Sequence, residues 1–150
     1  MEFNNAKSFN DLVECNRMYI NGVLDETPIH LGPLSEESLV IIDKLLLLSE
    51  WNVLTTSSQP AYIKDEHRQC GFIEGANQGN IEEFVNLLYE ETRLEYILIQ
   101  GNKCFKNVTK NVPHENRWDF TQEKLETGER WKTFTGLWLS DIEDDTACKV

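Results

Sequence analysis

The segment NVLTTSSQPAYI, residues 52–63, places four consecutive hydroxyl side chains between an apolar start and a proline. We predict a short strand over Asn52–Thr56, because its apolar and β-branched residues fit a pleated, half-buried surface. The hydroxyl run Thr55–Ser58 is poor core material and has no obvious use on a bare surface. It is therefore the first candidate for a ligand site. The helices and strands predicted on either side of it indicate the fold in which this site would lie.

Two segments have the cap residues and the apolar spacing of an amphipathic helix. The first begins at Ser8, with Asp11 three residues on, and closes at Asn21-Gly22. The second begins at Asn80, with Glu83 three residues on. Its apolar stripe at helical spacing consists of Ile81, Phe84, Val85 and Leu88. Each helix is expected to bury this one face.

The segment that leads into the hydroxyl run is also expected to be helical. Ser35 is predicted to cap a helix that continues to about Ser49. Glu36 and Glu37 would lie in its first turn, where the helix dipole favours anions. The body of this helix, LVIIDKLLLL, is apolar nearly all round, so we expect it to be deeply buried.

Three further segments favour strands. Gln69–Gly75 has Cys70 and Phe72 on one face, and Leu94–Ile99 is an apolar run that follows a helix. Lys103–Thr109 comes after a Gly-Asn turn and is its expected partner. Helices thus alternate with strands along one domain that spans the whole chain. The predicted fold class is α/β in the mixed α+β sense, with a central mixed sheet flanked by helices.

The end of the chain is predicted to be helical and then frayed. Residues 111–129 are polar and irregular, with a proline and a glycine. The aromatic and apolar residues that follow sit three or four apart, which predicts a closing amphipathic helix; they are Trp131, Phe134, Trp138 and Ile142. From about residue 143 the acidic residues indicate a solvated terminus.

The composition indicates an acidic globular protein. The chain has 14 basic and 26 acidic residues, a formal net charge of −12. Such a surface repels phosphate backbones, so direct nucleic-acid binding is disfavoured. A cationic ligand, or a protein partner that itself binds DNA, is compatible with it. Acidity of this size also serves solubility alone.

No feature of the sequence predicts export or a membrane span. The longest apolar run, Leu39–Leu48, is interrupted by Asp43 and Lys44, whereas a span needs about 18 apolar residues. The first residues lack the basic start and apolar stretch of a secretion signal. The four cysteines have no zinc-site spacing and are interpreted as reduced thiols. We therefore expect a cytoplasmic protein, of a cell or of an infected host, with no membrane partner.

Conventional catalytic and cofactor motifs are absent from the sequence. It has no GxGxxG, no GxxxxGK[ST], no HExxH and no GxSxG, and its three histidines are far apart. The acids within Asp141–Asp145 lack the ligand spacing of a calcium loop. We expect no cofactor, no metal and no enzymatic activity.

The hydroxyl segment nevertheless resembles a known family. LTTSSQP, followed by RQCGFIEG, is similar to the C-terminal regulatory domain of eukaryotic methylenetetrahydrofolate reductases, where a helix leads into an LTxxSQP strand and loop. That domain binds S-adenosylmethionine (SAM), the feedback inhibitor of the reductase. The likeness covers most of the chain, from about Ser8 to Asp145. The catalytic barrel that binds flavin and folate has no counterpart here, so the resemblance implies ligand binding without folate reduction.

The resemblance also implies a set of ligand contacts. The family's helix-start glutamate corresponds to Glu37, and its motif threonine and serine correspond to Thr55 and Ser58. Two downstream threonines correspond to Thr109 and Thr121, the second at a spacing one residue tighter than in the family. Hydroxyls and one carboxylate can bind the groups of SAM or S-adenosylhomocysteine (SAH), because each hydroxyl both donates and accepts.

These observations leave two function classes open. The first is a stand-alone module that binds SAM or a related adenosyl nucleotide without transforming it, either to sense the ligand for a partner or to sequester it. The second is an acidic, virus-encoded inhibitor that occupies the nucleic-acid groove of a host defence protein. An enzyme that cleaves or transfers from an adenosyl ligand is disfavoured, because the set holds no good nucleophile or general base.

Overall fold

A computed structural model describes residues 2–60, 62–64, 67–69, 71–92, 96–100, 103–107 and 122–138 of the chain. Its helices are η1 Phe3–Asn5, α1 Phe9–Ile20, η2 Glu36–Ile41, α2 Ile42–Glu50 and α3 Ile81–Thr92, of which η1 and η2 are 3-10 helices. Its strands are β1 Leu54–Gln59, β2 Tyr62–Lys64, β3 His67–Gln69, β4 Gly71–Asn77, β5 Tyr96–Gln100, β6 Lys103–Asn107, β7 Gln122–Lys124 and β8 Arg130–Trp138. The α/β class predicted from the sequence is confirmed.

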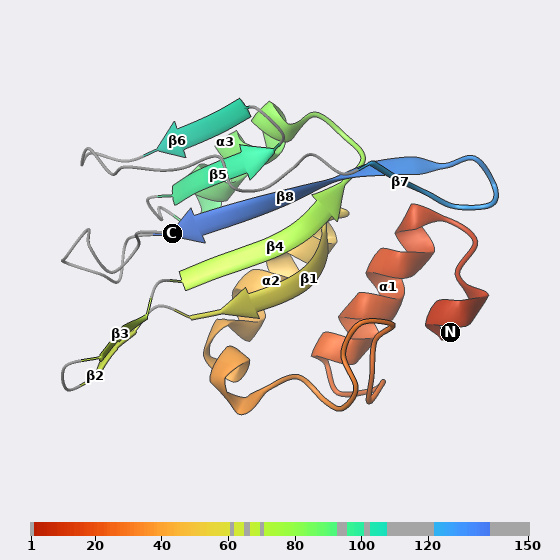
Figure 1. Ribbon diagram of the computed structural model, residues 1–150, viewed down its shortest axis with the longest axis horizontal. Coiled ribbons are helices and arrows are strands. Elements are labelled where there is room, and N and C mark those ends of the chain that lie inside the picture. The colour runs from red at the N-terminus through yellow and green to blue at the C-terminus, as the bar shows by residue number, and fades with distance from the viewer. Residues whose placement is uncertain are drawn as a thin grey trace.

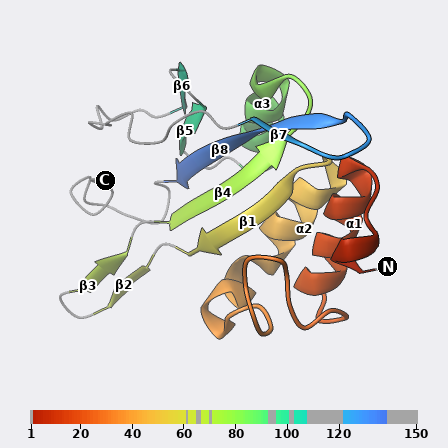
Figure 2. The same ribbon diagram turned by 45° about the vertical axis from the view of Figure 1, so that its right-hand side comes forward.

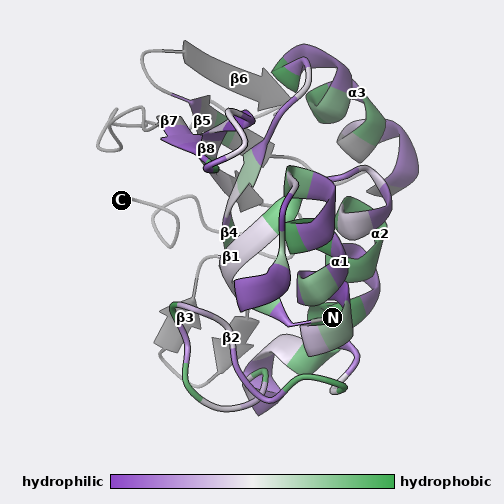
Figure 3. Cartoon of the chain, turned by 90° about the vertical axis from the view of Figure 1, so that its right-hand side faces the viewer, coloured by the Kyte–Doolittle hydropathy of each residue, from purple (hydrophilic) through white to green (hydrophobic). Residues whose placement is uncertain are grey.

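In the part of the chain that the structure describes, the main sheet has six strands in the order β1-β4-β8-β5-β6, with β7 paired to β8, and β2–β3 forms a separate hairpin. Each pairing among the described strands is antiparallel, so the expectation of mixed strand directions is corrected. The helices α2 and α3 lie behind this sheet, and α1 lies beyond its edge strand β1 (Figures 1 and 2). The helices carry both hydrophobic and hydrophilic residues on their surfaces (Figure 3), as expected for amphipathic helices that bury one face.

Most of the buried apolar side chains form one cluster, here called the large cluster. It joins α2, α3 and one face of the sheet, and consists of Ile20, Ile41, Leu45, Leu48, Val53, Ile73, Ile81, Phe84, Val85, Leu98 and Phe134. The Phe84 ring lies 5.5 Å from Phe134 and 6.2 Å from Trp51. Trp51 therefore packs against the core.

A second group, here called the small cluster, lies on the opposite face of the sheet. It contains Phe9, Val13 and Ala76, with Leu12, Leu54 and Trp131 packed against it. Gly75 and Ala76 are consecutive in β4 and so point to opposite faces. A Cβ at Gly75 would lie 3.0 Å from Phe134 of the large cluster, whereas Ala76 contacts the small one. The helix α1 contributes Ile20 to the large cluster and Phe9 to the small cluster. It therefore packs against both faces of the sheet at the edge formed by β1.

The predicted starts of two helices are confirmed by their caps. The Ser8 hydroxyl accepts a hydrogen bond from the Asp11 backbone N–H at 3.0 Å, and α1 begins at the next residue. The Asn80 side chain accepts from the Glu82 N–H at 2.9 Å at the start of α3. After α1 the chain turns at Gly22, whose φ of +80° lies in the left-handed region that glycine adopts without strain.

The helix expected over residues 35–49 differs from the prediction in its first half. Glu36–Ile41 is a 3-10 helix and the α-helix starts only at Ile42. Leu39 and Val40 are 52% and 71% exposed, so the expected deep burial of the whole segment is wrong. The 3-10 turn has three residues per turn, and it presents Ser38 and Ile41 inward while leaving these two apolar side chains outside.

The closing helix predicted from Trp131 onward is wrong, because residues 130–138 form the strand β8. β8 pairs with β4 along one side and with β5 and β7 along the other. The segment RWKTFTGLW is rich in threonine and aromatic residues, which favour strands, and Gly136 disfavours a helix interior. Ile142 and the acidic end from residue 143 lie outside the described residues.

The predicted strands are otherwise found with shifted bounds. The segment expected at 69–75 is divided between β3 and β4, and Cys70 lies outside the described residues. The two strands predicted around the Gly-Asn turn are confirmed as the antiparallel pair β5–β6. Of the polar stretch 111–129, the described part contains the short strand β7. Among the residues that the structure describes, no helix has the length and apolar character of a membrane span.

Candidate functional site

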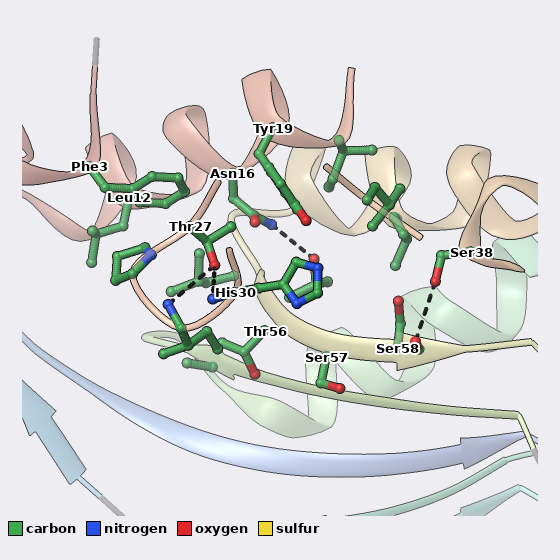
Figure 4. Close-up of a pocket in the computed structure, with 18 of the residues that line it drawn as sticks. Phe3, Leu12, Asn16, Tyr19, Thr27, His30, Ser38, Thr56, Ser57 and Ser58 are labelled. Atoms are coloured by element: carbon green, nitrogen blue, oxygen red, sulfur yellow. Dashed lines mark hydrogen bonds between the residues drawn. The ribbon is translucent and has the colours of Figure 1, made fainter. Parts of the chain in front are cut away.

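A cavity of about 690 Å³ lies between α1, the loop that follows it and the strand β1 (Figure 4). Phe3 and Leu12 are found at one end of it, and Ser38 and Ser58 at the other (Figure 4). We call these the aromatic end, lined by Phe3, Leu12, Leu54 and Trp131, and the hydroxyl end, lined by Ser35, Ser38, Ser57 and Ser58. This volume falls in the range of small-molecule sites, which is about 300–1,000 Å³.

The hydroxyl run of β1 lines the cavity along its length. All four residues, Thr55 to Ser58, contribute to the wall. The pairing of β1 with β4 shifts register between Thr55 and Ser57, which leaves Thr56 as an extra residue. Such a bulge interrupts the strict alternation of side chains between the two faces. Thr55 is consequently buried while Thr56 and Ser57 are both exposed, so hydroxyls meet the cavity from adjacent positions.

Thr55 is held by a buried hydrogen bond to α1. Its hydroxyl oxygen accepts from the Asn16 side-chain amide at 2.9 Å, and the two residues are 9% and 4% exposed. Both line the cavity. Because a buried polar group without a partner is costly, this bond fixes the position of β1 against α1. The Thr55 hydroxyl keeps its proton available as a donor to a ligand.

At the hydroxyl end, three serines connect η2 to β1. The Ser35 hydroxyl donates to the Ser38 hydroxyl at 3.2 Å, and Ser38 donates in turn to the backbone carbonyl of Ser58 at 3.4 Å. Ser38 is 2% exposed. This chain of contacts places the first turn of η2 against the strand and leaves the side chain of Ser58 half-buried at the wall.

The loop after α1 closes the middle of the cavity. The Thr27 hydroxyl accepts from the backbone N–H groups of Ile29 and His30, at 3.3 and 3.0 Å, which holds the loop in a turn. The Tyr19 hydroxyl donates to the Gly32 carbonyl at 3.1 Å, and the Tyr19 ring lies 6.4 Å from the His30 ring. Burial raises the pKa of Tyr19, so this hydroxyl remains a donor at neutral pH.

The aromatic end adjoins the small cluster. Trp131 packs its ring 5.5 Å from that of Phe9 and also lines the cavity. Leu54 and Ala76 lie in the same part of the wall, with Glu123 on the neighbouring strand β7. Glu123 is the one carboxylate among the described residues that line the cavity, and none of those residues is a lysine or an arginine.

The structure brings together two of the five residues predicted from the sequence. Thr55 and Ser58 line the same cavity. Glu37 is exposed and is not among the described residues of the wall, although its neighbours Ser35 and Ser38 are. Thr109 and Thr121 lie outside the described residues. The ligand contacts of all five stay predictions.

Several wall residues are not predicted from the sequence. Asn16 and Tyr19 sit one turn apart on α1, and an asparagine on the otherwise largely apolar buried face of that helix is the signal that could have indicated a polar site. His30 and Thr27 belong to a loop whose position depends on Tyr19. Glu123 comes from a segment expected to be irregular, and only its pairing with β8 brings it to the cavity.

The wall as described is suited to recognition by hydrogen bonding and apolar contact. Hydroxyls donate and accept, aromatic rings offer flat surfaces, and a single carboxylate contributes negative charge. Among the described residues no group of three or more histidine, cysteine, aspartate or glutamate side chains could hold a metal ion. Comparison of the chain with models of known protein families found no match, and comparison with curated proteins found none either.

Proposed function

We propose that this protein binds S-adenosylmethionine or a related adenosyl nucleotide in this cavity, without transforming it, to sense or sequester it. The observation that supports the proposal most directly is the division of a cavity of about 690 Å³ between a hydroxyl end and an aromatic end. An adenosyl ligand is divided in the same way, since a flat purine is joined to a ribose and an amino-acid tail rich in polar groups.

The hydroxyl end matches the polar part of such a ligand. Ribose hydroxyls, a carboxylate and an ammonium group require donors and acceptors at close spacing, and a serine or threonine supplies either. Ser57 and Ser58 present two of them from one strand, and Ser38 donates to the Ser58 carbonyl beside them. Thr56 adds a third hydroxyl nearer the middle of the wall (Figure 4). The LTTSSQP segment that resembles the regulatory domain of methylenetetrahydrofolate reductases is the same strand, which favours the same ligand.

Charge also favours a ligand with a positive group. The wall of described residues has one carboxylate, Glu123, and no lysine or arginine, and the chain as a whole has a formal net charge of −12. A sulfonium cation entering this cavity is therefore attracted by the protein's field. We expect binding rather than turnover, because hydroxyl and apolar groups dominate the wall and the two possible bases among its described residues, His30 and Glu123, come from separate elements, whereas general acid–base chemistry needs a paired and positioned base.

The test is calorimetric titration of the purified protein with SAM and with SAH. We expect a saturable signal for at least one of them, weakened by roughly tenfold in Thr56→Val, which removes a hydroxyl without changing the shape of the side chain. Thr127→Val is the matched control, because Thr127 is exposed in the β7–β8 turn and does not line the cavity. It should bind as the wild type does.

Two results would contradict the proposal. The first is the absence of any binding signal with either adenosyl compound at millimolar concentration. The second is equal weakening by Thr56→Val and Thr127→Val, which would place the ligand elsewhere on the molecule. Recovery of unchanged SAM after prolonged incubation is expected, and a product would show turnover.

A further inference from the structure

We propose that Glu123 and Trp131 form the base-recognition subsite of the cavity and select a 6-aminopurine over a 6-oxopurine. This inference rests on the proposed function, since it assigns the orientation of an adenosyl ligand in the same cavity. The purine would lie at the aromatic end, and the ribose and amino-acid tail would extend toward the hydroxyl end.

The register of the sheet places the two side chains together. Glu123 in β7 lies directly opposite Trp131 in β8. Directly opposed residues of an antiparallel pair project from the same face, with Cβ atoms about 5 Å apart. Both residues line the cavity, as do Thr133 two positions along β8 and its cross-strand neighbour Ala76. Glu123 is exposed, so its carboxylate can reach the border of the surface that the indole ring provides.

The apolar surroundings of Trp131 suit a flat heteroaromatic ring. The indole is half-buried and held against Phe9 at a ring separation of 5.5 Å, so it is fixed in place by the small cluster. Leu12 and Leu54 pack against the same cluster and line the same part of the wall. A purine that stacks on such a surface buries its faces and leaves its edge toward the opening.

A carboxylate at that edge distinguishes between purines by their hydrogen-bonding groups. The amino group at position 6 of adenine donates hydrogen bonds, and a carboxylate accepts them. Hypoxanthine has a carbonyl oxygen at position 6 in place of this donor, and its N1–H lies on the other side of that oxygen. A carboxylate on the N7 side of position 6 would therefore face a like partial charge in hypoxanthine and a donor in adenine. Because hydrogen bonds to charged groups are stronger than neutral ones, the preference should be large enough to measure.

The experiment compares SAH with S-inosylhomocysteine, which differ only at the base, on the wild type and on Glu123→Gln. Both probes lack the sulfonium charge, so the loss of a charged residue acts on them equally through the field of the protein. A glutamine can accept from an amine or donate to a carbonyl. We expect the wild type to prefer SAH by about tenfold or more, and Glu123→Gln to reduce this preference by about tenfold.

Glu126→Gln is the matched control, since it makes the same charge change at an exposed position of the same hairpin, outside the cavity wall. It should keep the wild-type preference. If SAH binds and Glu123→Gln leaves the preference between the two probes unchanged, the assignment of Glu123 is overturned while adenosyl binding stands. If the wild type binds neither SAM nor SAH, the proposed function itself has failed and this inference falls with it.

Discussion

The two hydrophobic clusters on the two faces of the sheet differ in completeness. Among the described side chains, the large cluster has eleven buried residues from α1, η2, α2, α3 and three strands, together with the residue that precedes β1. Among the same side chains, the small cluster has three buried residues, and half-buried side chains pack against them. Its border is the aromatic end of the cavity, where Leu12, Leu54 and Trp131 belong to both. One face of the sheet thus holds the fold together, and the other leaves a hollow that a ligand can fill.

Truncation of one side chain in each cluster should give the largest difference. Phe84→Ala removes a ring that contacts Trp51 and Phe134 in the large cluster, and we expect a loss of about 3–5 kcal/mol in the free energy of unfolding. Leu12→Ala, at the border of the cavity, should lose only about 1 kcal/mol, because the side chain is already half-exposed. Urea denaturation measures both. Equal losses would mean that the small cluster is as essential to folding as the large one.

The bond between Asn16 and Thr55, where α1 passes from one cluster to the other, should have an intermediate effect. Thr55→Val leaves the buried Asn16 amide without its acceptor, at a cost of about 1–3 kcal/mol. Replacing both partners, as in Asn16→Leu with Thr55→Val, should restore part of that stability, since no buried polar group is then left unpaired. A double-mutant cycle in urea gives the coupling energy. Strictly additive losses would contradict a direct bond between the two side chains.

The smallest expected effect concerns Glu74, which lies opposite Ser57 on the face of the sheet that carries the cavity. Burial raises the pKa of its carboxyl group. The folded protein therefore binds more protons than the unfolded chain, so its stability falls as the pH rises from the unfolded pKa through the folded pKa. Glu74→Gln removes the penalty on the charged form. It should raise the melting temperature at pH 7 and have no such effect below about pH 4.

Glu126→Gln, at an exposed position, is the control for this pH dependence. Thermal unfolding of both variants at the two pH values distinguishes burial of one carboxyl from a general reduction of the negative charge. If the control gains as much stability as Glu74→Gln at pH 7, the effect comes from net charge and not from the sheet face.

The sequence predicts correctly those helices and strands that are stabilised by residues close to them in the chain. The caps at Ser8 and Asn80 use side chains within three residues of the backbone groups they satisfy, so α1 and α3 begin where the sequence predicts. The β5–β6 hairpin depends on a turn and on strands that are neighbours in the chain, so the sequence predicts it for the same reason. The composition of the hydroxyl run makes it unusual for a core or a plain surface, and its resemblance to a ligand-binding domain predicts that it contacts a ligand.

Only the tertiary structure decided the elements that depend on distant partners. The aromatic spacing after Trp131 is compatible with a helix, yet β4 and β5 border the segment on both sides and make it a central strand. Glu123 reaches the cavity through its pairing with that strand, and Asn16 through α1. The sequence alone therefore determined the α/β class and a short strand at the start of the hydroxyl run, whereas the continuation of that strand to Gln59 follows from its pairing with β4. Which other side chains face the hydroxyls was decided by long-range pairing, because residues far apart in the chain acquire a common surface only when the sheet forms.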